Sequence, residues 1–296
     1  MLEVDLAGVK LRNPVVIASG ILGVSRGLFL RLDREGAGAV TTKSVTFEPR
    51  SGNPMPNVVE LEFGLVNSMG IPNPGIGIMC EEIRSAIPHL SVPIIGSIAP
   101  SSAEEARTMA SLLVEAGASA VEVNTSCPNV SDIGINLVNR SVELVKAVDR
   151  EVNVPILVKV TPHVQDVQSF VRALHEAGAD GFTAVNTLKA MVIDVDLMRP
   201  VLGGVVGGLS GPAVRPVAVR FVYEIRKTLP DVVIIGTGGV ESWRDAAEMI
   251  MAGANAVGVG TALRKGLKVI NEIVDGLRSF LTERGLTLDD IRGIVP

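Results

Sequence analysis

Four polar side chains stand where apolar runs of the sequence end. Lys43 ends AVTTK, Asn124 ends AVEVN, Lys159 lies in PILVKV, and Asn186 ends GFTAVN. A buried lysine is costly unless an anion or a polar ring partners it, so two such lysines indicate a ligand. Any one of the four residues could simply terminate a strand. All four together predict a binding site on one face of the molecule.

Cys127 stands among polar residues in VEVNTSCPN (121–129), three positions after Asn124. A buried structural cysteine usually has apolar neighbours instead. The thiol at this place could be a nucleophile, a base or an inert side chain. We interpret it as a group that meets a ligand from a loop, and this loop could close as a lid.

A Cys–His hydrolytic pair would need one of the three histidines. His89 and His175 are predicted in or near helices at the opposite end of the strands. His163 is expected at the same end, with a minor role at most. Cys80, in GIMCEEI, is predicted to be a helix-start or core residue. Cys/His spacing typical of a zinc site is missing, so we expect no metal.

Two glycine-rich turns follow apolar runs near the end of the chain, GTGG (236–239) and GVGTA (258–262). Backbone amides in such turns can approach a phosphate closely, although ordinary turns have the same composition. A third turn, NSMGIPNPG (67–75), carries Asn67, Ser68 and Asn73 as donors and acceptors. Its Met69 and Ile71 suggest that it packs over a ligand rather than standing free.

The chain repeats a helix–glycine–strand unit. The segments REGAGAV, EAGASAV, EAGADGF and MAGANAV are alike, and each joins a helical pattern to an apolar run. Strands that alternate with helices indicate parallel pairing. The predicted strands are 15–19, 39–43, 93–98, 120–124, 155–160, 181–186, 232–236 and 256–260. Eight βα units favour a (β/α)8 TIM barrel, with an open doubly wound sheet as the alternative.

Local signals refine this arrangement. Helices are predicted over 102–117, with a capping box of Ser102 and Glu105, over 242–253, and over 212–229 with Pro212 in its first position. The opening EVDLAGVKL could form a hairpin that plugs the bottom of the barrel. The long intervals 44–92 and 187–231 are insertions after strands 2 and 6, which lie on the active-site face of such barrels. We expect residues 1–296 to form one domain.

Composition excludes several classes of function. The chain has 296 residues, a formal charge of −5, one Trp and one Tyr, so neither a basic nucleic-acid surface nor an aromatic stacking platform is expected. Two cysteines cannot supply a disulfide scaffold or a four-cysteine iron–sulfur site. The sequence shows no signal peptide and no run of roughly 18 apolar residues. We therefore expect a soluble, cytoplasmic protein that does not bind membranes.

Taken together, these motifs resemble the dihydroorotate dehydrogenases of class 1. The match spans nearly the whole chain, through NPVVIASG, TTKSVTFEPRSGNP, NSMGIPNPG, VEVNTSCPN, VKVTP, AVNT, GGLSGPA, GTGGV and VGTA. A cysteine in the NTSCPN loop is typical of class 1, whereas class 2 enzymes have serine there and an N-terminal extension. The opening MLEVDLAGVKLRNP is more similar to the class 1B catalytic subunit than to class 1A.

The resemblance implies a flavoprotein that binds FMN and oxidises dihydroorotate to orotate in de novo pyrimidine biosynthesis. Cys127 would be the general base that takes the C5 proton, while hydride passes from C6 to the flavin N5. Lys43 could pair with the substrate carboxylate, and Lys159 could stabilise charge on reduced flavin. Two positions depart from the family pattern, Ser97 and His163, where asparagine is usual, and Ser97 is therefore not counted among the flavin contacts.

The resemblance also implies two sets of contact residues. FMN contacts would come from Ser19, Lys43, Ser44, Asn124, Lys159, Val185, Gly211, Gly238, Gly239, Gly260 and Thr261. Substrate contacts would come from Lys43, Asn67, Ser68, Met69, Gly70, Ile71, Asn124, Asn186 and Thr187.

Electrons must leave the reduced flavin, because this chain has too few cysteines for an iron–sulfur cluster and no convincing dinucleotide motif. They could pass to a soluble acceptor or to a partner protein. By the resemblance we expect a second subunit with FAD and a [2Fe–2S] cluster, NAD as final acceptor, and a homodimer core within a heterotetramer.

Other functions remain open on the sequence alone. A dihydropyrimidine dehydrogenase-like domain would usually come with iron–sulfur segments, and a tRNA dihydrouridine synthase needs a basic RNA-binding surface. A non-redox barrel that binds a phosphate would explain the glycine turns, but neither the thiol nor the two strand-end lysines.

Overall fold

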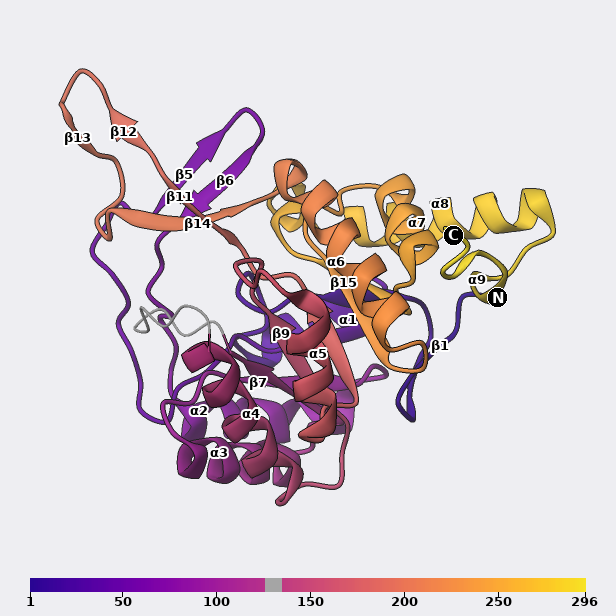
Figure 1. Ribbon diagram of the computed structural model, residues 1–296, viewed down its shortest axis with the longest axis horizontal. Helices are drawn as coiled ribbons and strands as arrows, with labels where there is room; N and C mark the ends of the chain where they lie inside the picture. The colour runs from indigo at the N-terminus through magenta and orange to yellow at the C-terminus, as the bar shows by residue number, and fades with distance from the viewer. Residues whose placement is uncertain (126–134) are drawn as a thin grey trace.

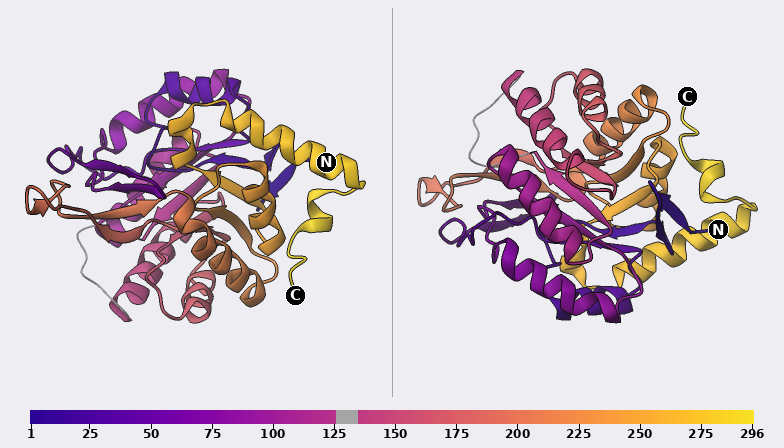
Figure 2. Two further views of the ribbon diagram at one scale, coloured as in Figure 1. Left: turned by 90° about the horizontal axis from the view of Figure 1, so that it is seen from above. Right: turned by 90° about the horizontal axis from the view of Figure 1, so that it is seen from below.

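The computed structural model describes residues 1–125 and 135–296, and within them eight parallel strands close into a barrel (Figure 2). The barrel strands are β3 (Val15–Ile17), β4 (Ala39–Thr41), β7 (Ile94–Ile98), β8 (Ala120–Asn124), β9 (Ile156–Val160), β10 (Gly181–Ala184), β15 (Val233–Thr237) and β16 (Ala256–Val259). Strand β16 pairs with β3, which closes the ring and excludes the open sheet. The predicted (β/α)8 barrel is confirmed, and all eight predicted strands form.

Helices cover the outside of the barrel (Figures 1 and 2). They are α1 (Arg26–Arg34), α2 (Ile76–Ala86), α3 (Ala103–Glu115), α4 (Ile135–Asp149), α5 (Val167–Glu176), α6 (Arg215–Thr228), α7 (Trp243–Ala252) and α8 (Val269–Arg284). Because both faces of the sheet are covered, every residue of β7, β8, β9 and β15 is buried. This burial explains the near-continuous apolar runs of the sequence.

Two helix starts differ in detail from the prediction. The Ser102 side chain accepts a hydrogen bond from the Glu105 amide, as expected, but the Glu105 carboxylate accepts from the amide of Ser101, so the capping box is not closed. Helix α6 begins at Arg215 rather than at Pro212. The preceding residues form a separate 3-10 turn, η2 (Pro212–Val214), which uses the proline at its own start.

The N-terminal hairpin forms as predicted from β1 (Val4–Leu6) and β2 (Val9–Leu11). Its turn places Ala7 and Gly8 at φ 51° and 96°, a left-handed pair typical of tight hairpin turns. Ala7 lines a cavity together with Val232 and Val233 where strand β15 begins. The hairpin therefore lies at the N-terminal end of the barrel, as a plug should.

The two insertions pair with each other in a four-stranded antiparallel sheet, which the sequence did not predict. The first contributes β5 (Val58–Leu61) and β6 (Gly64–Asn67), and the second contributes β11 (Leu188–Met191) and β14 (Val206–Ser210), in the order β11-β14-β6-β5. A small hairpin of β12 (Ile193–Asp194) and β13 (Arg199–Pro200) extends from it. The β5–β6 hairpin and the β12–β13 hairpin both project from the barrel (Figure 1).

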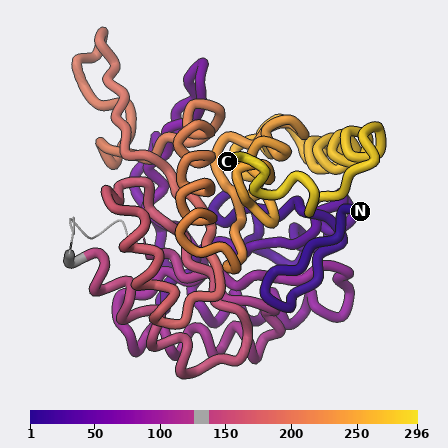
Figure 3. The backbone as a smooth tube through the Cα atoms, turned by 45° about the vertical axis from the view of Figure 1, so that its right-hand side comes forward, coloured from indigo at the N-terminus to yellow at the C-terminus, as the bar shows by residue number. Residues whose placement is uncertain are grey.

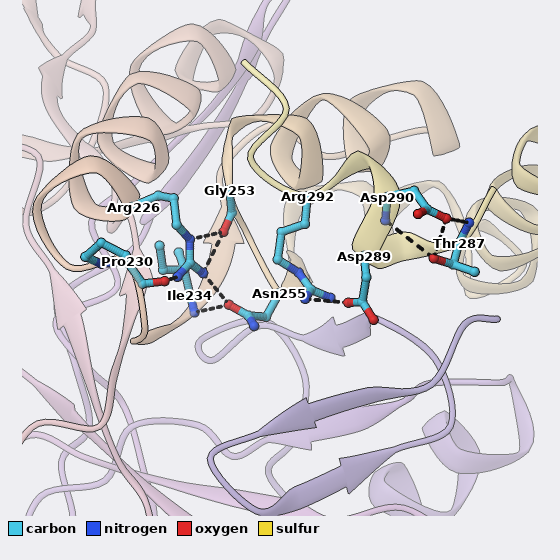
Figure 4. A network of polar contacts seen from close by, with 9 residues as sticks. All are labelled: Arg226, Pro230, Ile234, Gly253, Asn255, Thr287, Asp289, Asp290 and Arg292. Atoms are coloured by element: carbon cyan, nitrogen blue, oxygen red, sulfur yellow. Dashed lines mark hydrogen bonds and ion pairs between the residues drawn. The ribbon is translucent and has the colours of Figure 1, made fainter. Parts of the chain in front are cut away.

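Both chain termini lie in the part of the molecule that holds the C-terminal helices, drawn yellow in Figure 3. After α8, the short helix α9 (Leu288–Ile291) leads into the C-terminal tail. Arg226, near the end of α6, anchors this side by donating to the carbonyl of Gly253 and to Asn255 Oδ1 at 2.7 Å (Figure 4). Asn255 Oδ1 also accepts from the backbone amide of Ile234 at 2.9 Å.

Replacing Asn255 with alanine should destabilise the fold. The Ile234 amide would lose a side-chain acceptor and Arg226 one of its partners, and a buried unsatisfied donor costs about 1–3 kcal/mol. Denaturant unfolding measures the change, with Asn139→Ala on the exposed face of α4 as the matched control. Equal midpoints for the two variants would contradict this role of Asn255.

Candidate active site

The two predicted strand-end lysines converge on one loop. Lys159 Nζ donates to Ser19 Oγ at 2.7 Å, and Lys43 Nζ donates to the carbonyl of Gly20 at 3.2 Å. Ser19 and Gly20 follow strand β3, whereas the lysines belong to β9 and to the residues after β4. Both lysines are buried, at 6% and 8% exposure. The C-terminal ends of three strands thus meet at one place.

Among the described residues, no carboxylate neutralises the charges of these lysines. Within the described part of the chain, neither lysine has an acidic group within ion-pair distance of 4.0 Å. Burial and, secondarily, the charge of Lys159 lower the pKa of Lys43 from its usual value of 10.5. Two adjacent buried cations are costly, so this arrangement suits an anionic ligand.

The predicted amides join the lysines. Asn124 pairs with Lys159 in the strand ladder, and its Nδ2 donates to Ser44 Oγ at 3.3 Å. Asn186 Nδ2 donates to Asn124 Oδ1 at 3.4 Å, and Asn186 Oδ1 accepts from the amide of Thr187 at 2.8 Å. The four strand-end residues and Ser44 therefore form one polar cluster, as the sequence indicated.

The turn 67–75 is held rigidly over this end of the barrel. Asn73 Oδ1 accepts from the amides of Thr46 and Gly75, and its Nδ2 donates to Thr46 Oγ1 at 2.9 Å. These bonds tie the turn to the segment that follows Lys43. Met69, Gly70 and Ile71 are half-buried rather than fully exposed. The turn is a fixed wall, which the sequence could indicate only by composition.

Strand β14 lies against the predicted substrate residues of both insertions. Asn67 Nδ2 donates to the carbonyl of Gly208 at 3.2 Å. A Cβ atom on Gly208 would come within 2.1 Å of Thr187 Oγ1, and one on Gly204 within 2.0 Å of Ser68 Oγ. Gly204 therefore allows the second insertion to approach Ser68 of the first, and Gly208 allows β14 to lie against Thr187 of its own insertion.

The predicted phosphate-binding glycines form a cradle. Gly211, Gly238 and Gly239 have φ of 98°, 134° and 72°, which side chains rarely tolerate. A Cβ on Gly239 would lie 2.9 Å from the carbonyl oxygen of Gly211, and one on Gly211 would lie 3.7 Å from Thr261 Cγ2. Glycine-rich turns that lie together in this way can offer backbone amides to a phosphate.

The cradle connects to the lysine cluster. The 3-10 turns η2 and η3 (Thr261–Lys265) directly follow Gly211 and Gly260, their N-cap residues. A Cβ on Gly260 would lie 3.6 Å from Ala18 Cβ, next to Ser19, and one on Gly238 would lie 4.0 Å from Val185 Cγ2. The predicted cofactor residues therefore follow one continuous path along the rim. Two cavities, of about 240 and 320 Å³, lie at the N-terminal end of the barrel.

The remaining candidates divide clearly. His163 Nε2 accepts a hydrogen bond from the backbone amide of Lys189 at 3.2 Å and so joins its loop to β11. Burial and, secondarily, the charge of Lys189 lower the pKa of His163. His89 and His175 lie near the N-terminal end, as predicted. Cys80 is buried in α2, where burial raises its pKa. The predicted base, Cys127, lies outside the described residues.

The sequence reasoning missed a buried acid, Glu122, between Val121 and Val123 of β8. Glu122 is 1% exposed and accepts from Ser97 and Thr183. Ser97, which departs from the family pattern, is fully buried, and its Oγ lies 2.8 Å from Ser44 Oγ. An acid inside an apolar strand was the available signal. Groups of three or more possible metal ligands are not found in residues 1–125 and 135–296.

Comparisons with known proteins agree with this geometry. Residues 1–281 match the family described as Dihydroorotate dehydrogenase. The chain is 43% identical to a Pyrococcus abyssi protein over 289 residues, covering 96% of this chain and 95% of that one. It is 42% identical to a Desulforudis audaxviator protein over 287 residues, covering 96% and 93%. Both relatives are named dihydroorotate dehydrogenase B (NAD(+)), catalytic subunit.

The fold also matches a solved structure, that of DHODH from Eimeria tenella in complex with ferulenol. The TM-score is 0.84 at 22% identity, covering 99% of this chain and 88% of that one. In the described residues, no helix is long and apolar enough to cross a bilayer. The family match covers residues 1–281 and so includes the whole barrel and the strand-end cluster. The chain belongs to the dihydroorotate dehydrogenase family.

Proposed function

We propose that the protein is the catalytic subunit of a class 1B dihydroorotate dehydrogenase and oxidises (S)-dihydroorotate to orotate in pyrimidine biosynthesis. The observation that carries this proposal is the pair of buried lysines without carboxylate partners in the described residues, set among amides at the barrel rim. Dihydroorotate and orotate carry a carboxylate and a ring of amide groups, which match this donor set. The family membership supports the same reaction.

The proposed cofactor is FMN. The cradle of Gly211, Gly238 and Gly239 supports a phosphate site because these glycines, all at positive φ, lie together where the turn η2 begins and close to Thr261 of η3. Lys159, on the path from this cradle to the amides, suits the electron-rich end of a reduced isoalloxazine ring. When bound, FMN would supply the acceptor, at N5, for the hydride that leaves C6 of the substrate.

The chain's own residues would then bind and deprotonate the substrate. Lys43 would hold its carboxylate, and Asn67, Asn124 and Asn186 would hold the ring. Cys127 would take the C5 proton, which lies next to a carbonyl and needs a placed base. Thr125, two residues earlier, donates to the carbonyl of Lys159 at 3.1 Å and so fixes where the chain leaves β8.

The proposed assembly is a homodimer core with two electron-transfer subunits that carry FAD and a [2Fe–2S] cluster. The name catalytic subunit, given to the relatives, supports a partner protein. Apolar side chains on the β12–β13 hairpin are exposed, with Val195 at 79% and Met198 at 87%, and such exposed groups often mark protein interfaces. NAD would be the final electron acceptor, and the complex would work in the cytoplasm.

Cys127→Ala should keep FMN but lose most reduction by dihydroorotate at neutral pH, by roughly 100-fold or more, as expected for loss of a general base. Anaerobic bleaching of the flavin absorbance measures the rate. Cys80→Ala, which removes the buried thiol of α2, is the control and should reduce FMN at nearly the wild-type rate. Unchanged reduction in Cys127→Ala would remove its role as base.

Lys43→Met should weaken orotate binding by roughly 10- to 100-fold, because it removes a charge-assisted contact. The same variant should stabilise the ligand-free protein at neutral pH. Since the folded pKa of Lys43 is lowered, the penalty for its charge is complete below that pKa and disappears as pH rises toward 10.5. The gain in melting temperature should therefore shrink at alkaline pH.

The control for this variant is Lys146→Met, on the exposed side of α4. Calorimetry measures the orotate affinity of Lys43→Met and Lys146→Met, and thermal unfolding at several pH values measures their stability. A Lys43→Met protein that binds orotate normally, or that is less stable than the wild type at neutral pH, would contradict the assignment.

The isolated chain should be dimeric and should reduce FMN with dihydroorotate, yet fail to reduce NAD. Adding a subunit with FAD and a [2Fe–2S] cluster should restore NAD reduction. Light scattering gives the mass, and absorbance at the NADH band gives the turnover. A monomeric chain, or full NAD-linked turnover without a partner, would refute the proposed assembly.

A further inference from the structure

Glu122 is a buried acid to which the proposed reaction assigns no role. It lies in β8, inside the barrel, two residues before Asn124. Its two carboxylate oxygens accept from different hydroxyls, Ser97 at 2.9 Å and Thr183 at 2.8 Å. These three residues are at most 3% exposed. An acid buried this deeply is expensive, so its place below the site calls for a reason.

The acid sets the direction of a chain of hydrogen bonds. A serine hydroxyl has one hydrogen, and Ser97 gives its hydrogen to Glu122. In the contact between Ser97 and Ser44, at 2.8 Å, Ser44 must therefore be the donor. Ser44 is then left to accept, and it accepts from Asn124 Nδ2. The amide of Asn124 is thereby oriented with its nitrogen toward Ser44.

The same direction continues to the second amide. With its nitrogen toward Ser44, Asn124 turns its oxygen to Asn186, which donates through Nδ2. The oxygen of Asn186 accepts from the amide of Thr187. An amide group can otherwise be turned by half a rotation, which exchanges donor and acceptor. Among the residues that the structure describes, Glu122 sets this choice, because a reversed chain would leave two donors or two acceptors facing each other.

We propose that Glu122 and Ser97 are positioning residues that fix the amide orientation of Asn124 and Asn186 for an acceptor-rich ligand. This inference rests on the proposed function. An Asn186 amide held in this way keeps its second N–H for an oxygen of orotate. In the opposite orientation it would present its own oxygen to an oxygen of the ligand, and binding would weaken.

The structure offers a matched pair of variants. Ser97→Ala cuts the chain between Glu122 and the site, whereas Thr183→Val removes the other hydroxyl from the same carboxylate and leaves the chain intact. A role of Glu122 in folding alone would make the two variants alike. A positioning role separates them, because in the described residues Ser97, unlike Thr183, contacts Ser44 and through it the amides.

The test is calorimetry of orotate binding to the FMN-loaded protein. Ser97→Ala should raise the orotate dissociation constant about tenfold, and Thr183→Val by no more than about twofold, at similar losses in melting temperature. Glu122→Leu should behave like Ser97→Ala. In an Asn186→Ala background, Ser97→Ala should lose most of its effect, because the two residues act through one another.

Equal orotate affinities for Ser97→Ala and Thr183→Val, or additive effects of Ser97→Ala and Asn186→Ala, would overturn the positioning role while the proposed reaction stands. If the wild-type, FMN-loaded protein fails to bind orotate, the proposed function and this inference fall together.

Discussion

The site depends on two positive charges buried without a negative partner in the described residues. Lys43 and Lys159 are almost fully buried, and they contact a carbonyl and a hydroxyl rather than an acid. Burial of charge costs stability, and a pair of like charges raises the cost. The fold accepts this cost at the barrel rim, where an anionic ligand can offset it. Stability and function are thus opposed at these two residues.

The rest of the architecture serves this arrangement. Parallel strands deliver all their C-terminal ends to one rim, so residues far apart in sequence, such as Lys43 and Lys159, meet there. The sheet built by the two insertions adds a wall on this side, where glycines of β14 allow close approach to Asn67 and Thr187. The acid beneath the rim, Glu122, orients the amides. The barrel strands, the sheet of the two insertions and the buried acid thus act on the same site in different ways.

Local patterns in the sequence predicted most of the barrel. Strand–helix alternation, the repeated glycine at helix ends and the N-terminal hairpin are encoded in short segments, and all are confirmed. The four strand-end residues and the glycine cradle also lie together as expected. The pairing of β6 with β14 was not predicted, because it joins residues about 140 positions apart and no local signal sets its register.

Other features were hidden for physical reasons. Glu122 lies among apolar residues of its strand, and the two hydroxyls that donate to it belong to other strands. The hydrophobic pattern of the sequence therefore does not predict that it is a buried acceptor. The start of α6 was predicted at Pro212 because proline suits the first position of an α-helix. Proline suits the start of a 3-10 turn equally well, and that is the element it begins here. The role of Cys127 as the base was implied by the family resemblance, and it stays a prediction.

The central claim is that the strand-end lysines await an anion, and proton uptake on orotate binding tests it most directly. Binding an anion raises the lowered pKa of Lys43, so the FMN-loaded protein should take up protons when orotate binds at alkaline pH. Calorimetry in buffers of different ionisation enthalpy counts these protons, and the Cys127→Ala background removes a competing titration. Proton uptake that rises with pH is the predicted result. Orotate binding without uptake across the alkaline range would contradict the account.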